Sequence, residues 1–150
     1  MIAYPDTSFL CALYRLQANS PKAAAHFKRM REPLGVSSLL LFEFRQSLRY
    51  PAFLHEKDLR KGFDRTTGQA VLAKVQANIA DGAVVIIPVD WTDTHQIAER
   101  LSAQHTHAGG HRGFDILHVA TALHLGVREF LTFDANQKKL AKAEGLKLPL

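Results

Sequence analysis

Short apolar runs that alternate with longer helical segments constrain the fold of this chain more than any other feature. Gly, Pro or polar residues bound each run, as expected for short buried strands. The runs lie at residues 2–5, 34–36, 83–88, 129–133 and 146–148. Such alternation is typical of a parallel sheet that helices cover on both faces. We therefore predict an α/β fold with a central parallel sheet of about four to five short strands.

The segments between these runs carry apolar residues at helical spacing, together with start and stop signals. Ser20 before Pro21 predicts the N-cap of the second helix. Pro51 predicts that the third helix ends near Tyr50, and the Gly- and His-rich segment 105–113 predicts a loop. The expected helices span residues 7–17, 21–32, 38–50, 57–80, 92–104, 114–125 and 135–144, and Gly62 and Gly68 are candidate breaks in the fourth.

The composition places residues 1–150 in a single domain with a substantial core, because 47% of the residues are hydrophobic. Cys11 is the only cysteine, so we expect no disulfide framework, no cysteine-based zinc site and a reducing, cytoplasmic setting. No apolar run approaches the roughly 20 residues of a membrane span. The net charge of +5 favours a polyanionic partner, although a mildly basic enzyme without such a partner stays an alternative.

Four acidic residues occupy apolar surroundings, where a carboxylate is costly unless a cation or good hydrogen bonds compensate it. Asp6 and Asp134 directly follow predicted strands, and parallel sheets bind ligands beyond the carboxyl ends of their strands. Glu43 falls on the apolar arc of the third predicted helix. Asp115 lies at the start of the sixth predicted helix.

Each of these residues also has an ordinary structural interpretation. The three aspartates suit helix N-caps, and Glu43 suits a rim position paired with an arginine. Their shared placement instead predicts one shared cation. Ligation by oxygen alone points to Mg²⁺, with Mn²⁺ as a substitute. Because such ions promote phosphodiester cleavage, we expect a metal-dependent nuclease.

The segments that carry the four acidic residues resemble those of a PIN-domain protein of the VapC type, the toxin half of a bacterial toxin–antitoxin pair. The D-T-S start and the combination of D-I-L-H-V-A-T-A with T-F-D are the most specific parts. The segments follow one another from residue 2 to about residue 148 and read IAYPDTSFLCAL, VSSLLLFEFRQSL, FDILHVATALHLGV and FLTFDANQKKLAKAEGLKL.

The resemblance implies a three-layer PIN-like fold and the activity of a Mg²⁺- or Mn²⁺-dependent endoribonuclease. It also implies an RNA substrate, a small antitoxin protein as partner, and a homodimer. The family's acidic positions, both catalytic and metal-binding, fall on Asp6, Glu43, Asp115 and Asp134. Small polar residues that are candidates to support such a site are Thr7, Thr132 and Asn136.

Other polar and aromatic groups have weaker interpretations. The segment HTHAGGHR matches no common zinc-site spacing, and we expect a solvated loop beside the active site. His118 and His124 are expected to be packing or surface residues. Two basic bands either line an RNA groove or form solvated helix faces. They comprise Arg45, Arg49, Lys57, Arg60, Lys61 and Arg65, and Lys138, Lys139 and Lys142. Tyr50 and Phe53 are suited to base stacking, but burial in the core is the simpler expectation.

Two other enzyme classes fit less well, and one non-enzymatic class stays open. A HAD-type phosphatase needs a second aspartate two residues after the first, where this chain has Ser8. A receiver domain needs paired acids near the first strand, and this chain has none there. A catalytically inactive PIN-like binding or scaffold module would explain the fold, although it would not explain Glu43 on an apolar arc.

Overall fold

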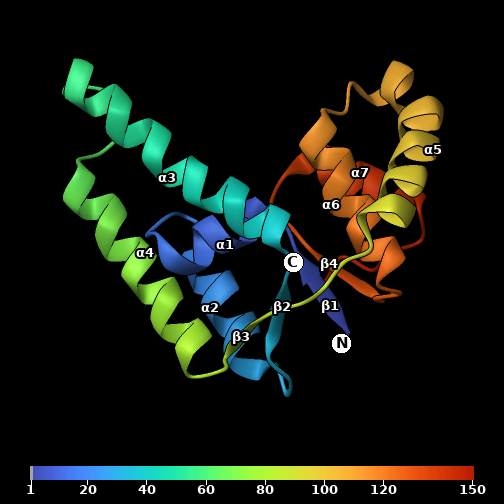
Figure 1. Cartoon of the computed structure of the whole chain (residues 1–150), viewed down its shortest axis with the longest axis horizontal. Coiled ribbons are helices and arrows are strands. Elements are labelled where there is room, and N and C mark those ends of the chain that lie inside the picture. The colour runs from blue at the N-terminus through green and yellow to red at the C-terminus, as the bar shows by residue number, and fades with distance from the viewer. Residues whose placement is uncertain (1) are drawn as a thin grey trace.

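The computed structural model describes residues 2–150, which form seven helices and four strands (Figure 1). The strands are β1 (Ala3–Pro5), β2 (Leu34–Val36), β3 (Val84–Ile86) and β4 (Glu129–Leu131). The helices are α1 (Thr7–Tyr14), α2 (Ser20–Arg29), α3 (Ser38–Lys57), α4 (Arg65–Ala80), α5 (Trp91–Gly109), α6 (Gly113–His124) and α7 (Ala135–Ala143).

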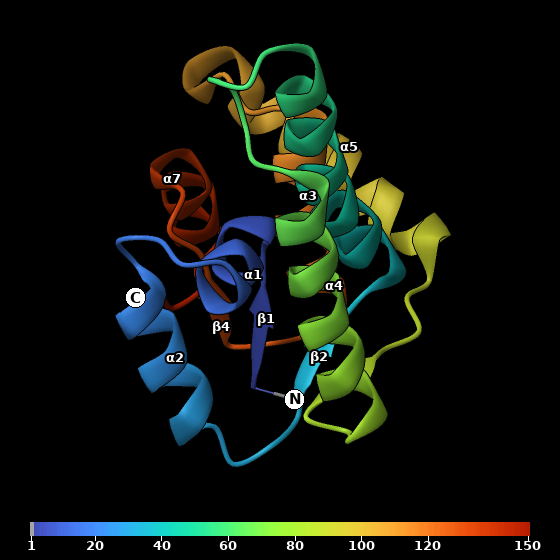
Figure 2. The same cartoon turned by 90° about the vertical axis from the view of Figure 1, so that its left-hand side faces the viewer.

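All pairing between the strands is parallel, as the sequence predicts. β1 pairs with β4, with Tyr4 opposite Phe130, and β2 pairs with β3, with Gly35 opposite Val85. β1 and β2 lie side by side in both views, so the spatial order is β3, β2, β1, β4 (Figures 1 and 2). The fifth predicted strand is reduced to one parallel bridge between Glu129 and Lys147.

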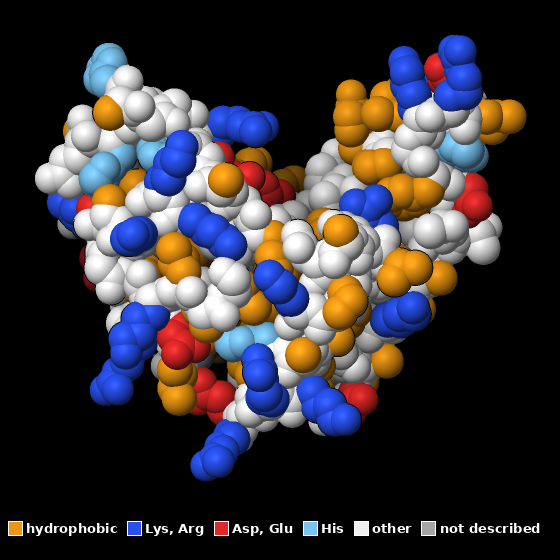
Figure 3. Space-filling model, turned by 180° about the vertical axis from the view of Figure 1, so that it is seen from behind, with side chains coloured by type: hydrophobic (Ala, Val, Ile, Leu, Met, Phe, Trp, Pro, Cys, Tyr) orange, Lys and Arg blue, Asp and Glu red, His pale blue; other side chains and the backbone are white. Residues whose placement is uncertain are grey.

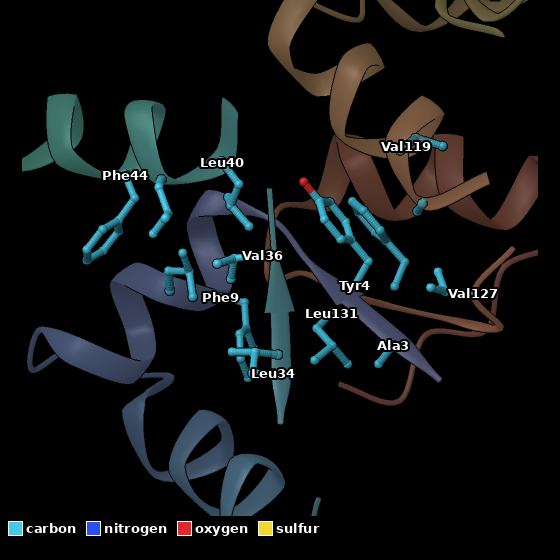
Figure 4. Close-up of a cluster of buried hydrophobic side chains, with 14 of the residues drawn as sticks. Ala3, Tyr4, Phe9, Leu34, Val36, Leu40, Phe44, Val119, Val127 and Leu131 are labelled. Atoms are coloured by element: carbon cyan, nitrogen blue, oxygen red, sulfur yellow. The ribbon is translucent and has the colours of Figure 1, made fainter. Parts of the chain in front are cut away.

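Helices cover both faces of these strands, with α1 to α4 on one side and α5 to α7 on the other (Figure 1). The core lies between these layers. Figure 4 shows Phe9 of α1 and Phe44 of α3 on one side of the strands, and Val119 of α6 on the other. All three side chains are fully buried, as is Tyr4 of β1. The three-layer arrangement predicted for the chain is confirmed.

Helix α3 continues through Pro51 to Lys57, so the predicted end near Tyr50 is wrong. A proline inside a helix removes one backbone hydrogen bond, but here buried Leu48 and Ala52 flank it and hold the helix against α4. The link between α3 and α4 folds back onto this point. Gly62 has φ +61°, and a Cβ on it would lie 2.0 Å from the carbonyl oxygen of Pro51.

The helical hairpin formed by α3 and α4 projects from the rest of the molecule (Figure 1). We call its outer part, residues 45–72, the arm. Tyr50 and Phe53 lie on the arm and are half exposed, so the expectation that they are buried in the core is wrong. The arm leaves their side of α3 without a covering helix, which a local sequence pattern does not reveal.

Two further predictions of local structure are wrong. α5 runs to Gly109, so most of the predicted loop at 105–113 is helix, and the helix ends at left-handed Gly110. Ser20 is the first residue of α2 and not its N-cap, because its hydroxyl instead donates to the carbonyl oxygen of Ala12 at 2.6 Å. Within residues 2–150, none of the helices combines the length and apolar character needed to cross a bilayer.

Candidate active site

The carboxyl ends of β1 and β4 bring Asp6 and its surroundings together. Asp6 follows β1, is fully buried, and caps α1 by accepting a hydrogen bond from the Phe9 amide at 2.9 Å. The Ser8 hydroxyl donates to the same Oδ1 at 2.7 Å, and the Thr132 hydroxyl donates to Oδ2 at 2.5 Å. The carboxylate is therefore fixed by residues from both strand ends.

Burial raises the pKa of Asp6 above its ordinary value of 3.8, and the hydrogen bonds from Thr132, Ser8 and Phe9, with the charge of His118, offset this effect only in part. Within residues 2–150, the hydrogen-bond donors to Asp6 are two hydroxyls and an amide, and none is a basic side chain. A buried carboxylate with this environment is costly as an anion unless a cation approaches it.

Asp134 follows β4 and is linked to Asp6 through one hydroxyl. Its backbone N–H donates to Thr132 Oγ1 at 3.0 Å, and Thr132 in turn donates to Asp6. The Asp134 carboxylate caps α7 through Oδ1, which accepts from the Asn136 and Gln137 amides at 2.8 Å each. The predicted capping role is confirmed, and Asn136 contributes to it through its backbone.

Glu43 lies on α3 with its side chain 25% exposed, and two elements hold its Oε2. Thr7 of α1, next to Asp6, donates to this oxygen, and so does His118 of α6, whose Nε2 lies 2.6 Å away. Because an ionised carboxylate only accepts, Nε2 must carry the proton in this contact. Burial alone would raise the pKa of Glu43, but the hydrogen bond and charge of His118, with Thr7 and Arg112, hold it below its ordinary value of 4.5.

The sequence interpretation missed two polar residues of this region, Ser8, which donates to Asp6, and His118. The His118 side chain is buried, and its Nδ1 has no hydrogen-bond partner within residues 2–150. The available signal was its position three residues after Asp115, which places both on one face of α6. Its partner, however, lies 75 residues away in the chain.

Asp115 occupies the first turn of α6 and is not its N-cap, which is Arg112. Its Oδ2 accepts from the Arg112 amide at 3.4 Å and lies 4.0 Å from the Arg112 Nε, and the side chain is 21% exposed. Asp115 and Glu43 share a surface hollow of about 340 Å³, lined also by Arg112, Gly113, Phe114 and Leu117. Figure 3 shows acidic side chains at the bottom of the notch between the arm and the opposite lobe.

The structure thus joins the four acidic residues as two linked pairs. Thr132 connects Asp6 with Asp134, the hollow connects Glu43 with Asp115, and Thr7 follows Asp6 and reaches Glu43. Within residues 2–150, no three His, Cys, Asp or Glu side chains lie close enough together to form a ready metal site.

The chemistry of the donors nevertheless fits a hard divalent cation. The four carboxylates supply oxygen atoms, which such ions prefer as ligands. The Nε2 of His118 already donates a hydrogen bond to Glu43. In the segment HTHAGGHR, His105 lies 2.8 Å from Glu144 and His111 is buried against Gly109.

Comparisons with known proteins agree with the fold. The structure resembles that of VapC20 from Mycobacterium tuberculosis, a sarcin–ricin loop cleaving toxin, with a TM-score of 0.69 at 18% identity, over 97% of this chain and 96% of that one. It also resembles VapBC2 from Rickettsia felis bound to a promoter DNA fragment, with a TM-score of 0.67 at 14% identity, over 99% and 97% of the chains.

A third similar structure is FitAcB from Neisseria gonorrhoeae, with a TM-score of 0.65 at 17% identity over 99% of this chain and 96% of that chain. A comparison with curated protein sequences finds no match. The family model of the PIN domain matches residues 3–143. Because that match spans nearly the whole sequence, this chain belongs to the PIN domain family.

Proposed function

We propose that this protein is a metal-dependent endoribonuclease and the toxin of a type II toxin–antitoxin pair. The observation that carries this proposal is the state of Asp6, a fully buried carboxylate at the joined ends of two parallel strands whose partners are hydroxyls and an amide. Membership of the PIN domain family supports the same conclusion, because nucleases of this kind use divalent ions.

Asp6, Glu43, Asp115 and Asp134 are the residues that would hold Mg²⁺, or Mn²⁺ in its place, directly or through water. A bound divalent ion supplies polarisation of the scissile phosphate, activation of water and stabilisation of the leaving oxygen. The chain itself orients the acids. Thr132 and Ser8 fix Asp6, and Thr7 and His118 fix one oxygen of Glu43, which leaves the other oxygen of Glu43 without a hydrogen bond from them.

The proposed partners follow from the relatives and from charge. VapC20 is described as a toxin that cleaves the sarcin–ricin loop, which supports RNA as the substrate class here. The net charge of +5 suits a phosphate backbone. We propose in addition a small antitoxin protein that blocks the site, a homodimer as the active form, and a cytoplasmic setting.

An inactive PIN-like binding or scaffold module is the second candidate, because no three ligands converge within residues 2–150. The experiment that separates the two uses protein freed of any antitoxin. Total cellular RNA is incubated with it in Mn²⁺, in Mg²⁺ or in EDTA, beside Asp115→Asn. Glu99→Gln, an exposed acid on α5, serves as the matched control.

For a nuclease we expect discrete RNA cleavage that needs the metal, persists in Glu99→Gln and disappears in Asp115→Asn. Mn²⁺ should also raise the melting temperature of the wild type and not that of Asp115→Asn, because binding to the native state stabilises it. A scaffold module would show neither cleavage nor the thermal shift, and that pair of results would end the nuclease proposal.

A further inference from the structure

An aromatic pair on the arm lies uncovered beside the candidate active site. Tyr50 and Phe53 are 55% and 50% exposed, and their rings stack with centroids 6.1 Å apart and planes at 27°. The ammonium group of Lys57 lies 5.7 Å from the centre of the Phe53 ring. Large aromatic side chains held in solvent in this way are ready to contact another molecule.

This pair belongs to a stripe of α3 that begins at Glu43. Residues seven apart in a helix return to nearly the same face, so Tyr50 lies about 10 Å along the axis from Glu43. Lys57 lies a further seven residues on, about 20 Å from Glu43 on the same face. Phe53 lies about 80° round the helix from Glu43 and joins this face through its ring contact with Tyr50. Tyr50, Phe53 and Lys57, which we call the arm stripe, continue from the acidic hollow toward the tip of the arm.

The charge around the arm stripe is positive. The arm contains six basic and three acidic residues. One of the acids, Asp58, is already paired with Arg60 at 3.0 Å and lies 3.9 Å from Lys61. Figure 3 shows Lys and Arg side chains next to hydrophobic ones at the end of the arm. A polyanion with flat apolar faces matches this combination.

We propose that the arm stripe is a binding platform for single-stranded RNA, on which unpaired bases next to the cleaved bond stack on Tyr50 and Phe53. Lys57 and its basic neighbours contact the phosphates. Aromatic side chains in a basic groove are the usual means of holding unpaired bases without reading their sequence. The proposal rests on the proposed ribonuclease function and adds a preference for unpaired over duplex RNA.

A protein partner suits this surface less well. Protein interfaces are depleted in lysine at their centres, whereas Lys57 stands over the Phe53 ring. Exposed Gln46 and Arg49 also border the stripe on α3. The arm stripe also adjoins Glu43. An RNA strand that reaches the acidic hollow must pass over the surface next to it, and the arm stripe is part of that surface.

The test measures RNA binding in EDTA, so that it does not depend on cleavage. Fluorescence anisotropy gives the Kd of wild type, the double variant Tyr50→Ala/Phe53→Ala, and the conservative double variant Tyr50→Phe/Phe53→Tyr. The probes are an unstructured RNA 12-mer and the duplex of the same sequence. Leu16→Ala removes an exposed apolar side chain outside the arm and is the matched control.

We expect the alanine pair to raise the Kd for single-stranded RNA by roughly tenfold or more, with little change for the duplex. The conservative pair and Leu16→Ala should bind as the wild type does. Tyr50→Trp should add a fluorescence signal that single-stranded RNA quenches. Lys57→Gln should reduce the salt dependence of binding, whereas Lys28→Gln on α2 should not.

An unchanged Kd in the alanine pair would overturn the platform, as would an equal loss for single-stranded and duplex RNA. If the alanine pair changes the molar mass in light scattering and leaves the Kd unaltered, the stripe is a contact between protein chains and the proposal is wrong. Because these measurements need no catalysis, RNA binding without cleavage would contradict the proposed function and still support the platform.

Discussion

The candidate active site and the arm are built in opposite ways. At the site, hydrogen bonds join residues far apart in the chain: Asp6 to Thr132, 126 residues away, and Glu43 to His118, 75 residues away. In the arm, the stacking of Tyr50 on Phe53 and the pairing of Asp58 with Arg60 are local. Its longer-range contacts include those of Ser47 with Cys11 and of Phe63 with Arg15. The site is therefore fixed by the assembled sheet, whereas the arm depends more on its own backbone. A substitution should disturb one region and spare the other.

Asp6→Asn should separate catalysis from stability most strongly. We expect at least a 100-fold loss of RNA cleavage, about 2.7 kcal/mol of transition-state stabilisation, because the proposed cation would lose one of its charged ligands. The melting temperature should not fall, since asparagine still accepts from the Phe9 amide and removes a buried charge. Cleavage rates and thermal denaturation measure the two effects, and full activity in this variant would remove Asp6 from the site.

Gly62→Ala should damage the arm and leave the site intact. A residue with a side chain is strained at φ +61°, and the Cβ would also meet the Pro51 carbonyl oxygen. We expect a loss of about 2 kcal/mol or more in the free energy of unfolding by denaturant. Gly82→Ala is the control, because Gly82 has φ +76° with open space around it. Equal losses in the two variants would show that the approach to Pro51 has no effect.

His118→Ala should weaken the metal affinity that Glu43 supports. Groups that orient a ligand typically change the affinity for metal by 10- to 100-fold, so we expect the Kd for Mn²⁺ in calorimetry to rise at least roughly tenfold. His118→Gln should recover part of the affinity, because its amide N–H can donate to Glu43 Oε2. An equal loss in both variants, or a loss of folded protein alone, would argue that His118 serves packing only.

The pH dependence of stability in EDTA should give the smallest effects, with opposite signs at the two carboxyl groups. The pKa of Glu43 is lowered in the folded protein. Its contribution to the free energy of unfolding is therefore fully present at pH values above the pKa of the unfolded state, and it is lost as the pH falls through the pKa of the folded state. The pKa of Asp6 is raised in the folded protein. Its contribution to the free energy of unfolding is therefore fully present at pH values below the pKa of the unfolded state, and it is lost as the pH rises through the pKa of the folded state.

Glu43→Gln should therefore flatten the melting-temperature profile at pH values below about 4.5, and Asp6→Asn should flatten it above about 3.8, the usual range of carboxyl groups. Melting curves from pH 3 to pH 7 compare them with the wild type. If the two variants change the melting-temperature profile in the same way, the opposite pKa shifts of Glu43 and Asp6 are wrong.

The sequence predicted the sheet because each strand has a complete local signature, an apolar run bounded by Gly, Pro or polar residues. The ordinary alternative for the aspartates, helix capping, holds for Asp6 and Asp134 and is wrong for Asp115, because Arg112 is the N-cap of α6. The assignment of all four acids to a metal stays a prediction. The pattern indicated that carboxylates sit in apolar surroundings, but the separation of Glu43 and Asp115 from the other two depends on how α3 and α6 pack.

Several failures of the sequence analysis have the same cause, a distant contact that overrides a local signal. Pro51 is a strong local stop, yet α3 continues because Leu48 and Ala52 are buried around it. The Gly- and His-rich segment after residue 104 is a weak helix former, but His105 contacts Glu144 of the C-terminal region and lies inside α5. His118 likewise acquires its role only when α6 meets α3.

The bridge between Glu129 and Lys147 has a consequence for self-association. The Phe130 amide donates to the Lys147 carbonyl at 2.9 Å, and the Lys147 amide donates to the Arg128 carbonyl at 3.0 Å. These bonds occupy the Phe130 amide and the Arg128 carbonyl on the outer side of β4, which leaves less of that edge for another chain to pair with. The opposite edge, β3, carries half-exposed Ile86 and no such cover among residues 2–150. Strand-to-strand aggregation of this protein should therefore start at β3, and a charged residue in place of Ile86 is the change that would oppose it.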